Sequence, residues 1–224
     1  MSSELISQIR DGGILYILLV IAITMHEFGH AYAADKLGCV LPRMQGRVSI
    51  NPLVHMDLMG TVVFPIMCIA LAAGTQFPLI FGWGKPVQMV FTNKATFVRD
   101  DIVSTLGGSA MNLVVALISA MALALLAAFN LNEYAQVAAY SIMINCVLFV
   151  INMLPIPPLD GARVLKHLLK ISDALYMSIA RYGIFIFFAV IFLPPTKAVL
   201  QFVIMFVNGI FFAIASGISA LFVK

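Results

Sequence analysis

Three residues in the first apolar stretch of the chain have the types and the spacing of a metal-dependent hydrolase. Met25 to His30 read M-H-E-F-G-H, so His26 and His30 are four positions apart and Glu27 follows the first histidine. On a helix, residues i and i+4 share one face, so both imidazoles can bind one Zn²⁺, while the carboxylate can accept a proton from a water that the ion activates. The pattern indicates metal-assisted hydrolysis of a peptide bond.

The surroundings of this motif are those of a membrane helix. Residues 13–34 are otherwise almost wholly apolar, and ionisable groups at membrane depth are functional by default. The stretch is longer than the apolar core of a signal peptide and carries the H-E-F-G-H pattern, so we expect it to be retained.

Composition places the chain among integral membrane proteins, with the lipid bilayer as its environment. Of 224 residues, 62% are hydrophobic and 10% are charged, and the mean hydropathy is +1.04. The net charge of +3 is spread over loops without a basic stripe, so we expect no nucleic-acid partner. The three cysteines, Cys39, Cys68 and Cys146, form no C-x-x-C pair and favour neither a disulfide framework nor a thiolate zinc site. No linker or repeat divides the chain, which predicts a single domain over residues 1–224.

The predicted fold is an all-α polytopic membrane protein with five to six membrane segments. Six apolar runs are long enough for a bilayer. They cover residues 13–34, 61–82, 103–129, 134–154, 174–193 and 198–222.

The second run is expected to enter the membrane and return as a re-entrant hairpin, because Pro65 and the segment Gly74–Pro78 interrupt it. An ordinary kinked span is the alternative. If the run re-enters, Lys and Arg outside the spans divide ten to two, with Lys224 in the majority and only Arg10 and Lys197 opposite. The positive-inside rule then puts the N-terminus outside and the zinc motif toward the cytoplasmic face.

A catalytic zinc usually takes three protein ligands, and Asp160 is the best candidate for the third. The stretch Asn152–Gly161 reads N-M-L-P-I-P-P-L-D-G, whose prolines forbid regular helix and hold the chain extended before the carboxylate. The spans 103–129 and 134–154 form a hairpin, so Asp160 reaches the end of the first helix only if residues 61–82 re-enter. The distribution of Lys and Arg and the need for Asp160 to reach the two histidines therefore both favour a re-entrant segment at residues 61–82.

Other His and Asp residues are less suitable as the third zinc ligand or remain alternatives to Asp160. Asp35 lies nine residues after His26 and so falls on the opposite helix face. His55 and Asp57, close after the first helix, stay open as alternatives. His167 is expected to belong to a solvated interfacial helix, and Asp100 and Asp101 are expected to be solvated charges or the start of a helix.

The chain resembles the site-2 protease family of intramembrane zinc metalloproteases. The resemblance rests on H-E-F-G-H, on G-G-S-A-M-N at Gly107–Asn112 and on N-x-x-P-x-P-P-x-D-G at Asn152–Gly161, in that order. The stretch after Arg47 is similar to the short bacterial and archaeal branch without appended domains. The resemblance implies one zinc ion held by His26, His30 and Asp160, with Glu27 as catalytic base.

Further roles are assigned with less support from the motifs. The resemblance implies that Asn152 holds the substrate or the developing oxyanion. Ser109 stands where the family usually has proline, which weakens any role for Asn112; small residues around it favour close helix packing instead. Asn112 and His55 are carried as candidate substrate-binding residues. The segment 46–51 is predicted to be a β-like membrane-surface strand whose edge could pair with an unwound substrate.

The predicted function is hydrolysis of peptide bonds within or near transmembrane segments of membrane protein substrates, in a prokaryotic cell membrane with the active site toward the cytoplasm. Two alternatives remain. A divalent-cation transporter would need polar groups at successive depths on several helices, and the spans contain few. An inactive scaffold with a structural zinc would need a closed, four-ligand site, for which no fourth ligand stands out.

Overall fold

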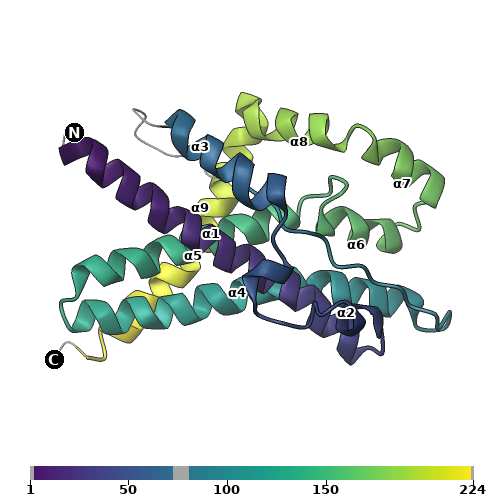
Figure 1. Cartoon of the computed structure of the whole chain (residues 1–224), viewed down its shortest axis with the longest axis horizontal. Helices are drawn as coiled ribbons and strands as arrows, with labels where there is room; N and C mark the ends of the chain where they lie inside the picture. The colour runs from purple at the N-terminus through teal and green to yellow at the C-terminus, as the bar shows by residue number, and fades with distance from the viewer. Residues whose placement is uncertain (1–2, 73–80, 223–224) are drawn as a thin grey trace.

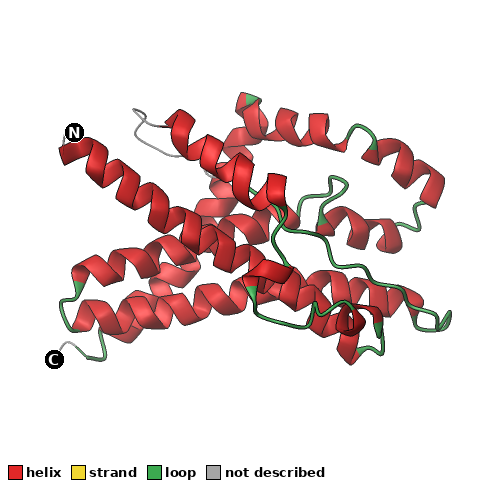
Figure 2. Ribbon diagram, in the orientation of Figure 1, coloured by secondary structure: helices red, strands yellow, loops and turns green. Residues whose placement is uncertain are grey.

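The structure, a computed structural model, describes residues 3–72 and 81–222. Within these ranges all regular secondary structure is helical, and Figure 2 shows only helices and connecting loops there. The predicted all-α architecture is therefore confirmed.

In the described part of the chain, four helices are long and apolar enough to cross a membrane. They are α1 (Ser3–Lys36), α4 (Phe97–Ala128), α5 (Asn132–Asn152) and α9 (Pro194–Ser219), and they cross one another in the body of the molecule (Figure 1). Their outward faces carry large exposed apolar side chains, such as Ile17 on α1 and Phe202 on α9. In an aqueous protein such side chains would cost solvation free energy, whereas lipid accommodates them. The protein is thus a multi-pass integral membrane protein.

The predicted span 174–193 is broken into two shorter helices. α7 (Asp173–Ala180) and α8 (Gly183–Phe192) are bent by 57° from each other. The break immediately precedes Gly183, which lies so close to the carbonyl oxygen of Pro157 that a Cβ would be 1.9 Å from it. The start of α8 is therefore in direct backbone contact with the proline-rich loop at the position of the bend.

Helices α1 and α4 are antiparallel and touch through glycine backbones. A Cβ on Gly29 would lie 2.3 Å from the carbonyl oxygen of Gly107, and a Cβ on Gly107 would lie 2.6 Å from that of Gly29. Only hydrogen at both positions permits this approach, which is the use expected of small residues in membrane helices. The polar groups on the two facing surfaces are therefore brought within bonding distance.

Helix α5 runs back along α4, and α9 completes the bundle. Ser119 and Ser141 hydroxyls lie 2.8 Å apart across the α4–α5 hairpin. The core between α4, α5 and α9 is built from small and apolar side chains, namely Ala116, Ala120, Ala124, Ile142, Cys146, Phe211 and Ala215. Its many alanines allow the three helices to pack closely.

The segment after α1 does not carry the chain across the bundle. A π-helical turn, η2 (Leu58–Val63), continues into α3 (Phe64–Ala72), and residue 81 then resumes beside the start of this segment. The Trp83 amide donates to the Gly60 carbonyl at 3.1 Å, and its ring lies 5.6 Å from that of Phe64. Residues 60 and 83 therefore lie side by side, so the chain makes no net crossing of the bundle between them; entry of this segment into the membrane stays a prediction. The predicted breakers at 74–78 lie outside the described residues.

The predicted side of the C-terminus is wrong. The last turns of α9 lie beside the last turns of α4, since Ser219 and Ala127 line one small cavity, so α9 runs parallel to α4. The N-terminus, the α4–α5 turn and the end of α9 therefore share one end of the molecule (Figure 1). The reason is that the α7–α8 pair bends instead of adding a crossing.

The predicted β-like segment 46–51 is not a strand. Gly46 has φ +67° at the turn after the short helix α2 (Leu41–Met44). Arg47 then buries its guanidinium, which donates to the carbonyls of Val54 and Lys85. Asn51 accepts from the Leu53 amide and caps a 3-10 turn, η1 (Pro52–Val54). These local bonds leave no extended edge there.

Candidate metal centre

The structure brings His26, His30 and Asp160 together at the α1–α4–α6 junction. The two Nε2 atoms are 3.0 Å apart, and Asp160 Oδ2 lies 3.4 Å from each of them. Among the described residues, this is the single group of three or more His, Cys, Asp or Glu whose ligand atoms lie within 4.8 Å of one another. Asp160 is the first residue of α6 (Asp160–Leu168), directly after the proline-rich loop.

The spacing of these three atoms fits one zinc ion. Zinc bonds to nitrogen and carboxylate oxygen are about 2.0–2.2 Å, so ligand atoms at the corners of a tetrahedron are about 3.3 Å apart. The observed edges of 3.0, 3.4 and 3.4 Å match that triangle. Three nitrogen and oxygen donors leave a fourth position for water or substrate, which is the arrangement of catalytic sites rather than structural ones.

Hydrogen bonds at the far side of each imidazole orient the two histidines. His26 Nδ1 lies 2.7 Å from Asn112 Oδ1, and His30 Nδ1 lies 2.9 Å from the Ser104 carbonyl. Because both partners are acceptors, each Nδ1 carries the proton and each Nε2 presents a lone pair. Two lone pairs 3.0 Å apart beside a carboxylate repel one another unless a cation lies between them. The donor set therefore fits a metal ion on chemical grounds as well as by distance.

Asn112 is held in place by a second asparagine. Its amide nitrogen donates to Asn145 Oδ1 at 3.0 Å and to the Ala22 carbonyl at 3.3 Å, and its side chain is fully buried. Asn145 in turn donates to the Ser141 carbonyl. The role of Asn145 was not predicted from the sequence. The available signal was the presence of a polar amide side chain in the apolar run 134–154, where polar residues are usually functional.

Asp160 also has a partner on α4. The Ser109 hydroxyl donates to Asp160 Oδ2 at 3.3 Å. Ser109 is the residue that departs from the proline of the family motif, and proline has no group that could make this bond. The departure thus adds a polar contact to one of the proposed ligands.

Glu27 faces the segment that follows the re-entrant turn. Its carboxylate is largely buried and accepts a hydrogen bond from the Val87 amide at 3.2 Å. The Arg47 guanidinium is 3.9 Å from Glu27 Oε2. The same guanidinium bridges the Val54 and Lys85 carbonyls, so it fixes the loops beside Glu27. No sequence pattern predicted the role of Val87, because its contact with Glu27 is made by the backbone; for Arg47 the one available signal was an isolated arginine in a loop.

The other predicted residues lie apart from the ligand group. His55 is fully buried and its Nε2 donates to the Ser49 carbonyl at 2.7 Å; burial lowers the pKa of His55 and so favours the neutral ring. Asp57 accepts from the Gly60 amide, and Asp35 pairs with Arg43 at 2.6 Å. Asn152, at the end of α5, donates to the Leu148 carbonyl at 2.9 Å.

The expected helix start at Asp100 and Asp101 is confirmed, since both lie in the first two turns of α4, but the expectation of solvated side chains is wrong for both aspartates and for His167. Both aspartates are 3% exposed. Asp101 binds the guanidinium of Arg163 and lies 2.6 Å from His167 Nε2. α6 folds against the first turns of α4 and removes these groups from solvent, which local sequence cannot show.

Comparison with known proteins identifies relatives over most of the chain. The model of "Peptidase family M50" matches residues 127–194. A Bacillus subtilis protein named "Putative zinc metalloprotease YwhC" is 34% identical over 81% of this chain and 80% of its own length. A Mycobacterium tuberculosis protein named "Putative zinc metalloprotease Rip2" is 26% identical over 96% of this chain and 77% of its own length. The protein of the same name in Mycolicibacterium smegmatis is 31% identical over 79% of this chain and 65% of its own length. No solved structure gave a significant match. The chain belongs to peptidase family M50, the site-2 protease family, and is an intramembrane zinc metalloprotease.

Proposed function

We propose that this chain cleaves transmembrane segments of membrane protein substrates at a single zinc ion held by His26, His30 and Asp160. The observation that carries the proposal is the triangle of donor atoms with edges of 3.0, 3.4 and 3.4 Å. Its members come from α1 and α6, which are more than 120 residues apart in sequence. Ionisable side chains that converge inside a bundle of membrane helices mark a functional site by default.

Zinc bound there would supply Lewis-acid polarisation of the scissile carbonyl and make a nearby water more acidic. Glu27 follows His26 on α1 and is the carboxylate placed to accept the proton of the attacking water and pass a proton to the leaving amine. The Val87 amide and the Arg47 guanidinium hold this carboxylate, at 3.2 and 3.9 Å from Oε2. Asn112 is assigned to positioning, because its carbonyl oxygen fixes the ring of His26.

Asn152 is proposed as the oxyanion donor. Its amide nitrogen now donates to the Leu148 carbonyl, so it would have to exchange that bond for one to the substrate. His55 has one ring nitrogen, Nδ1, without a hydrogen-bond partner and is carried as a candidate substrate contact.

The active site is proposed to face the cytoplasm of a prokaryotic cell. Nine of the 13 Lys and Arg residues lie at the end where α1 finishes and α4 begins, in the last turn of α1, the first turn of α4, the short helices α2 and α6 or the loops beside them. They are Lys36, Arg43, Arg47, Lys85, Lys94, Arg99, Arg163, Lys166 and Lys170. The α4–α5 turn at the other end carries none. The positive-inside rule favours the cytoplasm for the end rich in basic residues.

Cleavage of single-span substrates in the presence and absence of a chelator tests this function. Purified protein and a panel of single-span substrates are incubated in lipid vesicles, and the products are mapped by mass spectrometry. We expect a cut within or next to the span that is lost with the chelator and restored by Zn²⁺. The Glu27→Gln variant, which keeps all three ligands, should bind zinc and cleave nothing. Uptake of Zn²⁺ into sealed vesicles without any cleavage would favour the transporter instead.

A further inference from the structure

Asp101, in the second turn of α4, binds two side chains of α6. Its carboxylate accepts from Arg163 Nε at 3.0 Å and also from Arg163 Nη2, which makes the pair bidentate. His167 Nε2 lies 2.6 Å from Asp101 Oδ2. The side chains of Asp101 and His167 are 4% and 8% exposed and so are buried, whereas the Arg163 side chain, at 38%, reaches the surface.

The two partners share a helix face with a proposed zinc ligand. Asp160, Arg163 and His167 lie at positions i, i+3 and i+7 of α6, which places them along one face. Asp160 meets Ser109 of α4, and the other two meet Asp101. α6 is thereby fastened to α4 at both of its ends.

The spacing of these attachments is matched on the two helices. Asp101 and Ser109 are eight residues apart, about 12 Å along a helix, and Asp160 and His167 are seven apart, about 10 Å. Asp160 and His167 belong to one short helix. A shift of α6 at the Asp101 contact therefore also shifts Asp160 relative to Ser109. α4 also carries the hydrogen-bond partners of both histidines, Ser104 and Asn112.

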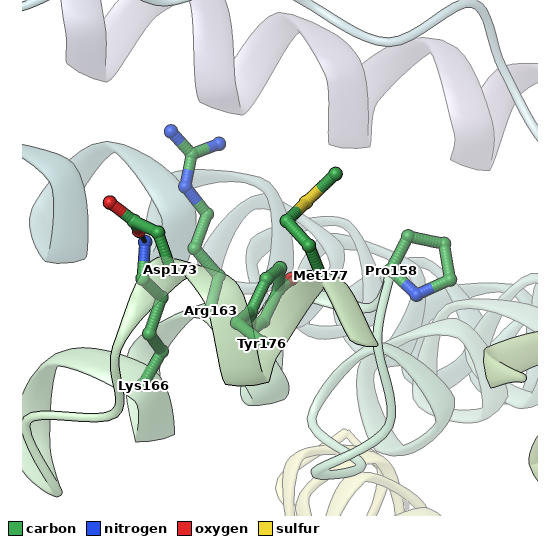
Figure 3. A pocket seen from close by; sticks show the side chains of 6 residues that line it. All are labelled: Pro158, Arg163, Lys166, Asp173, Tyr176 and Met177. Atoms are coloured by element: carbon green, nitrogen blue, oxygen red, sulfur yellow. Dashed lines mark ion pairs between the residues drawn. The ribbon is translucent and has the colours of Figure 1, made fainter. Parts of the chain in front are cut away.

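α6 also contacts α7, where Lys166 pairs with Asp173 and lies 5.4 Å from the centre of the Tyr176 ring. A cavity of about 350 Å³ separates α6 from α7 and is lined by side chains of both helices and of the preceding loop (Figure 3). The lining residues are Pro158, Arg163, Lys166, Asp173, Tyr176 and Met177. α4 is the element on which α6 packs most extensively.

We propose that Asp101 is a positioning residue of the metal centre: by binding Arg163 and His167 it sets the rotation and the axial position of α6, and so holds Asp160 within bonding distance of the site formed by His26 and His30. The inference rests on the ligand set proposed above. It assigns Asp101 no contact with substrate or metal.

The test compares two neighbouring aspartates of equal burial. Asp101→Asn removes the charge that binds α6, whereas Asp100→Asn is a matched control, because Asp100 pairs with Arg99 of its own helix. Zinc affinity of the purified protein is measured by competition with a chromophoric chelator, and the visible spectrum of the Co²⁺-substituted protein reports the ligand geometry. We expect Asp101→Asn to weaken zinc binding about 10- to 100-fold and to change the Co²⁺ spectrum, as loss of an outer partner does. Asp100→Asn should change neither.

A double variant separates positioning from general stability. In an Asp160→Asn background the carboxylate ligand is already lost, so adding Asp101→Asn should weaken zinc binding by much less than it does alone. A lower melting temperature with unchanged zinc affinity and unchanged Co²⁺ spectrum would make Asp101 merely structural and overturn the proposal. Equal losses in both backgrounds would also overturn it.

Two milder variants cover the case in which Asp101→Asn does not fold. Arg163→Lys and His167→Gln each weaken one attachment and keep the other, and each should weaken zinc binding by a smaller factor; unchanged affinity in both would refute the proposal. If Asp160→Asn alone binds zinc as tightly as the unmodified chain, the ligand set itself is wrong. The Asp160→Asn measurement does not involve Asp101, so failure of the proposed ligand set can be distinguished from failure of the positioning role of Asp101.

Discussion

The Nδ1 atom of His26 lies 2.7 Å from the side-chain oxygen of Asn112, across the contact between α1 and α4. Asn112 is itself fixed by Asn145 of α5 at 3.0 Å. One chain of hydrogen bonds therefore runs through three membrane helices and ends at a proposed zinc ligand. Since all its members are buried, no water can replace a lost partner.

Replacing Asn112 by Ala should weaken zinc binding about 10- to 100-fold, because His26 loses the acceptor that orients its ring. Chelator competition on the purified protein measures the change. Asn145→Ala, one step farther from the metal, should give a smaller loss in the same direction. Ser119→Ala is the control, since its hydroxyl bonds the Ser141 hydroxyl, whereas Asn145 donates to the Ser141 backbone carbonyl, which this substitution leaves in place. An Asn112→Ala variant with unchanged zinc affinity would rule out the positioning role.

Replacing Asp160 by Asn should lower zinc affinity at least about 100-fold, more than loss of an outer partner, because a charged ligand becomes a weak neutral one. Asp57→Asn should leave zinc affinity unchanged, since Asp57 accepts from the Gly60 amide and an asparagine oxygen can do the same. Zinc content after dialysis and chelator competition give both values. Loss of zinc in the Asp57 variant and not in the Asp160 variant would reverse the assignment of the third ligand.

The H-E-F-G-H motif could be predicted from the sequence because its residues are close in the chain and the helix period alone puts both histidines on one face. Asp160 needed a topological argument, since its distance from His26 depends on how many times the chain crosses the membrane between them. That argument required only the side on which Asp160 emerges. It therefore survived the incorrect placement of the C-terminus.

Asp101 could not be interpreted from the sequence. It follows Arg99 and Asp100, a pattern typical of a solvated helix start. Its burial comes from α6, about 60 residues later, which supplies both the cover and the two bonding partners. The roles of Asn145 and Ser109 were hidden for the same reason: each depends on which atoms a distant helix presents, and hydrophobic periodicity carries no such information.

Replacing Gly108 by Ala should disturb His30 directly. A Cβ there would lie 2.4 Å from His30 Nε2 and 2.5 Å from Cε1, and the ring is held on its other side by the Ser104 carbonyl. We expect a destabilisation of about 1–3 kcal/mol, as for other overpacked sites, together with loss of zinc binding. Gly209→Ala on α9 is the control, because nothing lies within 4 Å of the added methyl group. Melting temperature in detergent and zinc content report both effects, and normal zinc binding by Gly108→Ala would mean that this side of the ring is free.

Replacing Arg47 by Lys should reduce cleavage while leaving zinc bound. The Arg47 guanidinium bonds the carbonyls of Val54 and Lys85 simultaneously, and an ammonium at the end of a flexible stem cannot reproduce that fork. The segment that carries Val87, whose amide holds Glu27, would lose its fixed position. Losing one hydrogen bond from a charged group costs about 1.5–3 kcal/mol, which corresponds to roughly a 10- to 100-fold lower kcat if it falls on the transition state. Arg43→Lys is the matched control, because Arg43 pairs with Asp35 at an exposed position. Equal cleavage rates for the two variants would show that Glu27 does not depend on this bridge, whereas loss of zinc from Arg47→Lys would place the effect on the ligands instead.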